Sequence, residues 1–453
     1  MASNPDTIAA LATPAGTAAL ALLRLSGPAA RAVGGAALGG ELAPRHATHR
    51  DYRDAAGTVL DDVVATLAVG PHSYTGEDTL EIACHGSPYI VRRILADLLA
   101  RGCRPAGPGE FTQRAFLNGR MDLSQAEAVM DLIHARSERG LASAQQVLRG
   151  ALSRHLAQLV DGILGALALV EAYIDFPDED LPPEDREALA GKIRGVLAGT
   201  GQLLATEQTG RRFREGIATV ILGETNAGKS SLLNRLVGRE RAIVSPEPGT
   251  TRDFIEEAID VGPHALTVID TAGLNAAAAG LELRGIEKTL ERAAAADLFL
   301  LVLDAGRPAP AWPPAVLSRI TNLNTVVVWN KADLGPADAA ALPSPPAGLP
   351  ALPVSALTGA GFGPLRGELE RCAERLQETF GDERIAINVR HAHYLGEARA
   401  CLEAALAKVE SSGPAELLAS DLRGALSALG EISGKVDNER MLDQLFASFC
   451  IGK

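Results

Sequence analysis

A single segment, 223–230, most constrains the fold of this chain. It reads Gly-Glu-Thr-Asn-Ala-Gly-Lys-Ser and matches the spacing of a phosphate-binding loop, or P-loop. An apolar, β-branched run precedes it over 217–222, and a run with helical character follows it over 231–237. In that setting the glycines let backbone N–H groups surround a phosphate at the N-terminus of a helix. The segment therefore predicts a strand, a P-loop and a helix in a nucleotide-binding α/β domain.

Two side chains of the P-loop carry its predicted chemistry. We expect Lys229 to contact the β- and γ-phosphates of the nucleotide and the hydroxyl of Ser230 to bind Mg²⁺. The alternative is a glycine-rich turn that only links a strand to a helix, and it is disfavoured because all three parts occur in order. The predicted nucleotide contacts in and after the loop are Asn226, Ala227, Gly228, Lys229, Ser230 and Ser231.

Two further segments predict the remainder of the phosphate and metal site. Asp270 follows an apolar run, where its carboxylate can hold Mg²⁺ through water, and Gly273 leaves room for its N–H to meet the γ-phosphate. The segment 249–253, Gly-Thr-Thr-Arg-Asp, is typical of a first switch, with Thr251 as the second hydroxyl ligand of Mg²⁺. The predicted contacts around the aspartate are Asp270, Thr271, Ala272 and Gly273.

An Asn-Lys-Ala-Asp segment, 330–333, predicts which base is bound. The Asp333 carboxylate can accept both N–H groups of a guanine edge, which adenine does not offer. An unpaired buried acceptor is costly, so this contact discriminates strongly between the bases. The Val-Ser-Ala-Leu segment 354–357 then supplies a backbone contact to guanine O6. The predicted base contacts are Asn330, Lys331, Asp333, Ser355 and Ala356.

The group that activates water is less apparent. Leu274 stands where many small GTPases carry the glutamine that orients the attacking water. Asn226 is a candidate ligand for a monovalent cation, which would supply charge in place of an arginine finger. Glu282 could orient the water. For each residue the alternative is an exposed polar side chain, and the residues alone favour that alternative for Glu282.

Composition narrows the class of protein. A chain of 453 residues predicts about three domains. Five cysteines without a C-x-x-C pair suit a reducing cytosol, and no uninterrupted apolar run reaches the length of about 18 residues that a membrane span needs. The net charge of −13 disfavours sequence-independent binding to nucleic acid, so an RNA partner must meet a local basic patch or be held by another protein. We expect a soluble, cytoplasmic protein without a membrane contact.

Hydrophobic periodicity divides the chain into segments. Short strands and helices are predicted to alternate over 1–118, and a helical pattern runs through 119–215, with one stretch over 122–174 and another over 188–206. A doubly wound G domain is expected over 216–376. From Tyr394 to the end the pattern of the last segment, 377–453, is helical again. The sequence thus predicts a multidomain α/β protein whose G domain is inserted into a discontinuous helical domain.

The ends of the chain distinguish among GTPases. The C-terminal Phe-Cys-Ile-Gly-Lys, 449–453, resembles the signature of the tRNA-modifying GTPases called MnmE or TrmE. The resemblance covers essentially the whole chain and also rests on Leu-Arg-Leu-Ser-Gly at 23–27, Ser-Tyr-Thr-Gly-Glu-Asp at 73–78, Pro-Gly-Glu-Phe-Thr at 108–112 and Arg-Ala-Phe-Leu-Asn-Gly at 114–119.

This resemblance implies a fold, an activity and partners. It implies an N-terminal α+β domain that forms a homodimer and binds 5-formyl-tetrahydrofolate or a related folate. It also implies GTP hydrolysis that needs K⁺ as well as Mg²⁺. With a flavoprotein of the MnmG (GidA) type, in a heterotetramer, such proteins modify C5 of the wobble uridine, position 34, of certain tRNAs. They add an aminomethyl-type (carboxymethylaminomethyl) group with a one-carbon unit from tetrahydrofolate.

The resemblance also assigns residues. Glu282 matches the catalytic glutamate, and Cys450 is either a nucleophile or a small packed residue, two readings that stay open. By position the K⁺ ligands are Asn226, Ser245, Glu247 and Thr250, and the folate-binding residues are Arg24, Glu81, Arg120 and Lys453.

The chain departs from the family pattern at three places. The departures are Ala-Gly-Thr-Ala-Ala at 15–19, an apolar second switch at 275–280, and Gly-Lys at 434–435.

Two other functions compete with a tRNA-modifying GTPase. A ribosome-associated regulatory GTPase switch is the main alternative, and the absence of a KH-type RNA-binding signature disfavours it. A folate-binding scaffold with a decayed G domain is disfavoured by the intact P-loop.

Overall fold

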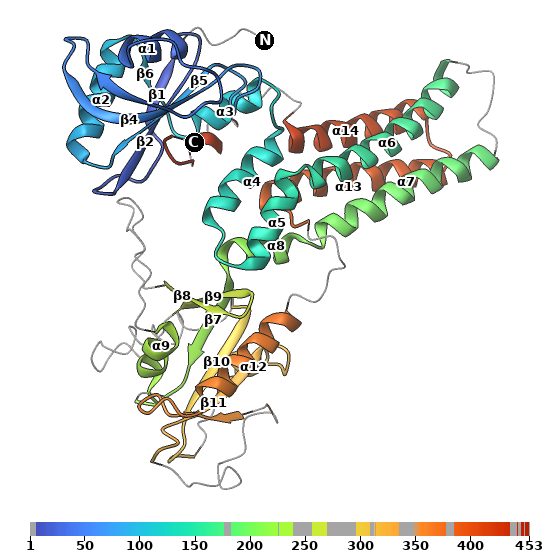
Figure 1. Ribbon diagram of the computed structural model, residues 1–453. Coiled ribbons are helices and arrows are strands. Elements are labelled where there is room, and N and C mark those ends of the chain that lie inside the picture. The colour runs from blue at the N-terminus through green and yellow to red at the C-terminus, as the bar shows by residue number, and fades with distance from the viewer. Residues whose placement is uncertain are drawn as a thin grey trace, which may run out of the picture. The chain divides into compact units, whose positions relative to one another are not determined.

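The computed structural model describes two compact units. Residues 1–130, 153–160 and 420–453 make up the first unit, and residues 131–152 and 161–419 the second. The structure describes residues 6–452 except 176–182, 225, 239–255, 270–295, 309–311, 313, 335–348, 350, 377–384, 435–441, 443–444 and 448. Figure 1 shows the elements of both units.

A six-stranded sheet forms the centre of the first unit, in the order β3-β4-β5-β2-β1-β6. Neighbouring strands are antiparallel except for the parallel pair β1 and β6. The strands are β1 (Ile8–Leu11), β2 (Leu20–Ser26), β3 (Thr48–Arg53), β4 (Val59–Ala68), β5 (Thr79–His85) and β6 (Arg104–Pro105). The predicted alternation of strands and helices in this part of the chain is confirmed.

Alternate residues of these strands build the first core. Leu23 and Leu25 of β2 share a buried cluster with Leu80 and Ile82 of β5, as the two-residue period of a strand requires. Helices α1 (Ala30–Ala37) and α2 (Pro88–Ala100) contribute to the same cluster through Val33, Ala37, Ile94 and Leu98. The other face of β2 and β5 is therefore left for polar side chains.

The C-terminal segment completes the first unit. Phe446 and Phe449 pack with Leu123 and Ala126 of helix α4 (Leu123–His134) in a separate cluster. Ile451 forms an isolated antiparallel bridge with Pro108, just before helix α3 (Glu110–Leu117). The prediction that the chain is helical to its end is wrong here, because the last described residues make this bridge instead.

A second six-stranded sheet lies in the second unit, in the order β12-β11-β10-β7-β9-β8. It is parallel except for the antiparallel pair β8 and β9. The strands are β7 (Ile217–Leu222), β8 (Glu256–Val261), β9 (His264–Ile269), β10 (Leu298–Asp304), β11 (Thr325–Asn330) and β12 (Ala351–Pro353). The predicted strand before the P-loop and the strand before the Asn-Lys-Ala-Asp segment are both confirmed.

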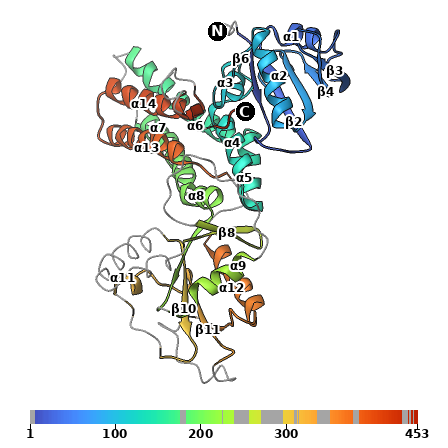
Figure 2. The same ribbon diagram turned by 90° about the vertical axis from the view of Figure 1, so that its left-hand side faces the viewer.

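Both faces of this sheet are buried, which explains its continuous apolar strands. Leu300 and Val328 belong to the core on one face, together with residues of α9 (Lys229–Val237) and α12 (Phe362–Arg375). Leu301 and Trp329 belong to the core on the other face, with Val316 of the short helix α11 (Pro314–Leu317). Figure 2 shows α9 and α12 on one side of the sheet and α11 on the other.

The helical stretch predicted over 122–174 is divided into three helices. The first part, α4, ends at His134, and Ser137 begins α5 (Glu138–Leu148), because its hydroxyl accepts a hydrogen bond from the Gly140 N–H. Gly150, at a φ of 79°, ends α5 before α6 begins. The remaining helices of the described chain are α5 (Glu138–Leu148), α6 (Ala151–Asp175), α7 (Pro183–Leu204), α8 (Glu207–Glu215), α13 (Val389–Glu410) and α14 (Ala415–Ser433).

Helix α6 is long and apolar enough, by length and composition, to cross a membrane. Core helices of soluble proteins pass the same test, so one such helix is weak evidence. Its sequence is interrupted by Arg154, Asp161 and Glu171. Gly162 faces α7 so closely that a Cβ there would lie 2.7 Å from a methyl group of Val196. Part of α6 is therefore packed against another helix of this protein.

Candidate functional site

The P-loop joins β7 to α9, and two of its glycines are required by close contacts. A Cβ on Gly223 would lie 2.2 Å from the carbonyl oxygen of Val302 on β10. Gly228 has a φ of 89°, and a Cβ there would lie 2.2 Å from the amide nitrogen of Asn330. Because both contacts are tighter than any side chain allows, glycine at these two positions lets the loop curl against the sheet.

Lys229 is the most buried charged residue of the loop, with 6% of its surface exposed. Its Nζ donates hydrogen bonds to the carbonyl oxygens of Gly223 (2.8 Å) and Glu224 (2.9 Å). The ammonium group thus bridges the start of the loop to the first residue of α9. It lies where a phosphate bound by the loop would meet a positive charge.

The other predicted P-loop contacts differ in how far they are exposed. Asn226 is exposed and has a φ of 66°, in the left-handed region that asparagine tolerates better than most residues. Ser230 and Ser231 are exposed in the first turn of α9, whereas Ala227 is buried. The carboxyl ends of β7, β10 and β11 meet at this edge of the sheet, which is the usual ligand edge of an open α/β sheet.

Asn330 connects the P-loop to the base loop, which we define as residues 355–358. Its amide nitrogen donates to the carbonyl oxygen of Ala227 (2.8 Å), and its amide oxygen accepts from the N–H of Ala356 (3.0 Å). Asn330 and Ser355 are both buried, and the Ser355 hydroxyl accepts a hydrogen bond from the N–H of Thr358. The structure thus brings the predicted phosphate and base segments together.

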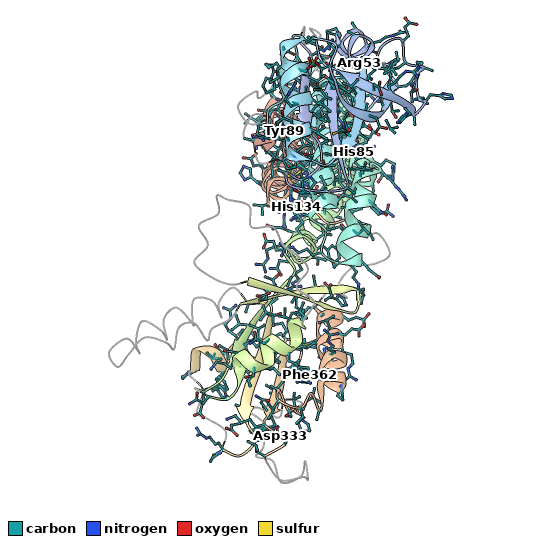
Figure 3. All side chains as sticks on the ribbon, turned by 60° about the vertical axis from the view of Figure 1, so that its left-hand side comes forward. Arg53, His85, Tyr89, His134, Asp333 and Phe362 are labelled. Carbon is teal, nitrogen blue, oxygen red and sulfur yellow. The ribbon has the colours of Figure 1, made fainter. Side chains whose placement is uncertain are left out.

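Asp333 lies beyond the end of β11 and is exposed, as Figure 3 shows. Its neighbour Lys331 donates from Nζ to the Asp304 carboxylate at 2.8 Å. Burial alone would raise the pKa of Asp304, but hydrogen bonding to Lys331 holds that pKa below its usual value. The ion pair fixes the turn that presents Asp333. Asp304 was not predicted, although an acid at the carboxyl end of an apolar strand is a readable signal.

Several predicted site residues fall outside the described part of the chain. They are the switch and metal residues Ser245, Glu247, Thr250, Thr251, Asp270, Thr271, Ala272, Gly273 and Glu282, together with Lys453.

A second polar site lies on the first unit, where β2 and β5 pair. Arg24 and Glu81 are direct partners across the two strands, and the guanidinium donates to the carboxylate from Nε (3.0 Å) and Nη2 (2.7 Å). The Arg24 guanidinium also lies 5.6 Å from the ring centre of Tyr74 and 5.7 Å from that of Phe111. Sequence reasoning missed both aromatic residues, although each lies inside a motif that it singled out.

The C-terminal segment reaches this same site. Nη1 of Arg24 donates to the carbonyl oxygen of Gly452 at 3.3 Å. The carbonyl oxygen of Cys450 accepts from the N–H of Gly109, and the Cys450 residue is half-buried. Arg120, which follows α3, is exposed. The structure therefore places Arg24, Glu81 and the residue before Lys453 together.

Sequence comparison places the chain in one family. A family profile described as the MnmE helical domain matches residues 123–450, and another, described as the GTP-binding protein TrmE N-terminus, matches residues 7–120. The chain belongs to the MnmE family. A tRNA modification GTPase MnmE from Opitutus terrae is 56% identical over 448 residues, covering 99% of both chains. Another, from Akkermansia muciniphila, is 43% identical and covers 100% of both.

Among solved structures the likeness is slight. The G domain of the T. maritima FeoB iron transporter matches at 22% identity with a TM-score of 0.25, covering 35% of this chain and 98% of that one. In this MnmE-family chain the two profiles together match residues 7–120 and 123–450, a range that includes Arg24, Glu81 and the P-loop. The P-loop and its contacts with the base loop are seen in the structure itself.

Proposed function

We propose that this chain is a K⁺-dependent GTP hydrolase that modifies the wobble uridine of certain tRNAs together with a flavoprotein partner. One observation carries the proposal. Asn330 ties the P-loop to the base loop through Ala227 and Ala356, in a chain that aligns over nearly its full length with relatives named tRNA modification GTPases. The phosphate and base segments are thus linked as one guanine nucleotide site.

The described nucleotide residues suit GTP with Mg²⁺. Lys229 would neutralise the β- and γ-phosphates, and Asp333 would accept the N–H groups of guanine. Bound Mg²⁺ would offset negative charge on the phosphates. The residues that would hold the nucleotide are Asn226, Ala227, Gly228, Lys229, Ser230, Ser231, Asp270, Thr271, Ala272, Gly273, Asn330, Lys331, Asp333, Ser355 and Ala356, with Ser230 and Thr251 as ligands of Mg²⁺.

A potassium ion beside the phosphates would complete the hydrolytic site. The exposed Asn226, at the open side of the P-loop, would supply a side-chain oxygen. Ser245, Glu247 and Thr250 would supply the others, and Glu282 would orient the attacking water. Fixed positive charge aimed at the phosphates lowers the barrier to their cleavage, and K⁺ would act here without an arginine finger.

Purified protein is expected to hydrolyse GTP about a hundredfold faster in K⁺ than in Na⁺ at matched ionic strength. The substitution Asn226→Ala should remove this advantage. Gln202→Ala, which changes an exposed amide on α7, serves as the matched control and should retain it. Equal rates in the two salts would refute the cation site while leaving GTP hydrolysis itself supported.

The polar site on the first unit is proposed to bind 5-formyl-tetrahydrofolate or a related folate. The Glu81 carboxylate can accept pterin N–H groups, and Tyr74 and Phe111 offer aromatic faces near Arg24. Arg24, Arg120 and Lys453 supply positive charge for the folate carboxylates. Cys450, whose backbone is held beside α3, is the candidate nucleophile of this site.

We further propose four functional segments in the cytoplasmic protein. Residues 1–118 would form the folate-binding domain through which the protein dimerises, and residues 216–376 the G domain. Residues 119–215 and 377–453 would form the two parts of a discontinuous helical domain into which the G domain is inserted. An MnmG (GidA)-type flavoprotein and tRNA would be the partners, in a heterotetramer.

Mass spectrometry of tRNA nucleosides tests the biological part of the proposal. A strain that lacks the gene is expected to lose the carboxymethylaminomethyl-type group at C5 of uridine 34, and the intact gene should restore it. Normal modification in the deletion strain would refute the tRNA function. A ribosome-associated regulatory GTPase would then become the better interpretation.

A further inference from the structure

Arg235 makes an unusual set of contacts with the base loop. From α9 its Nη1 donates to the carbonyl oxygens of Ala356 (3.2 Å) and Leu357 (2.8 Å), and its Nη2 donates to that of Thr358 (3.0 Å). One guanidinium thus binds three successive carbonyl groups through the planar, fixed fork of donors that distinguishes arginine from lysine.

Two neighbours shape the space around the guanidinium: an aromatic ring that it contacts and a glycine that leaves room for it. Its carbon lies 5.6 Å from the ring centre of Phe362, which begins α12 and is labelled in Figure 3. Gly359 has a φ of 90°, and a Cβ there would lie 2.2 Å from Nη2 of Arg235. The sequence after the base loop therefore leaves room for the arginine.

The contacts fix which way the base loop points. In a trans peptide the C=O and the following N–H point in opposite directions. Because the carbonyl groups of Ala356 and Leu357 point to Arg235, the N–H groups of Leu357 and Thr358 must point away from it. Consistent with this, the Thr358 N–H bonds to the Ser355 hydroxyl. The N–H of Ala356 likewise bonds to Asn330. The loop is held by its carbonyl groups on one side and by its amide groups on the other.

We propose that Arg235 is a positioning residue for guanine recognition: by binding the Ala356 carbonyl group it aims the N–H of Leu357, a base-loop amide that bonds to neither Asn330 nor Ser355, at guanine O6. This inference rests on the proposed GTP function and deepens it. An alternative is that Arg235 only offsets the negative end of α9, where it occupies the last turn. The alternative does not account for the contacts, because the carbonyl groups that Arg235 binds belong to the base loop.

The arrangement also links the two halves of the nucleotide site. Helix α9 begins at Lys229, the P-loop lysine, and carries Arg235 near its other end. Phosphate and base recognition are therefore held by one short helix and by Asn330.

Binding measurements with altered bases test the proposal on the full-length protein. The probes are GDP, 6-thio-GDP, which replaces only O6 by sulfur, and IDP, which lacks only the 2-amino group that Asp333 would bind. We expect Arg235→Ala to weaken GDP binding about fivefold and 6-thio-GDP binding much less. The ratio of the GDP and IDP dissociation constants should stay unchanged. Arg235→Lys, which keeps the charge and loses the fork, should fall between Arg235→Ala and wild type.

Arg366→Ala is the matched control, because the guanidinium of Arg366 on α12 also binds a backbone carbonyl, but that of Leu236 in α9 rather than one in the base loop. It should leave all three affinities as in wild type. Equal losses for GDP and 6-thio-GDP, or a changed ratio of GDP to IDP, would mean that Arg235 acts on the fold in general and would overturn the proposal. Unchanged GDP binding in Arg235→Ala would overturn it too. If wild-type protein binds no GDP, the proposed function fails instead, which is a separate result.

Discussion

Replacing Lys229 with alanine is expected to lower GTP turnover about a thousandfold and to weaken GDP binding about thirtyfold. The ammonium group is almost fully buried in the P-loop and already bonds to the carbonyl oxygens of Gly223 and Glu224. A bound phosphate would replace one of these neutral acceptors with a charged one. Turnover suffers more than binding because charge builds up on the phosphate oxygens as the bond breaks.

Steady-state turnover and isothermal titration with GDP measure the two effects separately. Lys192→Ala, which removes an exposed lysine from α7, controls for the change in net charge and should behave as wild type. A Lys229→Ala protein that retained wild-type turnover would contradict the assignment of the P-loop as the hydrolytic site. A loss of folding can be recognised because circular dichroism would report it.

Replacing Arg114 with methionine is expected to destabilise the first unit by about 3–5 kcal/mol. Only 2% of the Arg114 side chain is exposed, and it bonds to carboxylates of Asp6 (2.7 Å), Glu110 (2.9 Å) and Glu77 (3.2 Å). Methionine keeps much of the volume but removes the cation that Glu77 contacts, and it leaves Asp6 and Glu110 with Arg104 as their shared cation. The destabilisation should appear as faster hydrogen exchange in β1 and α3.

Arg53→Met provides the comparison for this substitution. Arg53 forms an ion pair of 2.7 Å with Asp51, but both side chains are about half exposed. Exposed pairs contribute about 0–1 kcal/mol, so this variant should unfold nearly as wild type does. If the two variants lost similar stability, burial of the Arg114 cluster would not be what makes it important. GDP binding should remain in both variants, because the P-loop belongs to the second unit.

The same cluster predicts how stability depends on pH. Burial by itself raises the pKa values of Asp6 and Glu110, but hydrogen bonds from Arg104 and Arg114 hold both below their ordinary values of 3.8 and 4.5. A carboxyl group with a lowered pKa in the folded state stabilises the fold above its unfolded pKa. That stabilisation is lost as the pH falls through the folded pKa. The difference in unfolding free energy between wild type and Arg114→Met should therefore be largest near pH 7 and shrink below about pH 4.

The sequence predicted the parts of the fold that are encoded locally. The P-loop motif has a fixed spacing, and an apolar strand and a helix lie directly next to it in the sequence. Its position could therefore be predicted from the sequence alone. The helix boundaries near Ser137 and Gly150 were missed because the whole stretch 122–174 was assigned by its overall helical pattern, without attention to the polar run 134–140. A serine cap and a glycine stop were present there and could have been used.

Contacts between distant segments could not be predicted in the same way. Arg235 and the base loop are separated by more than a hundred residues, and nothing in the sequence around Arg235 distinguishes it from an ordinary surface arginine. The pairing of Arg24 with Glu81 depends on the register of β2 against β5, which a single sequence does not specify. That Arg24 and Glu81 belong to one folate-binding site could be predicted only through the resemblance to a family.

The way in which the first unit is completed has a consequence for protein synthesis. Its sheet and α3 are made first, but the bridge from Pro108 to Ile451 and the packing of Phe446 and Phe449 use residues at the other end of the chain. The ribosome must translate all of 161–419 before that end emerges. Domains usually fold in the order in which they are made, and synthesis proceeds at about 5–20 residues per second. Here the unit that begins to form first can be completed only after residues 446–451 have been made, so part of its surface stays uncovered in the nascent chain until then.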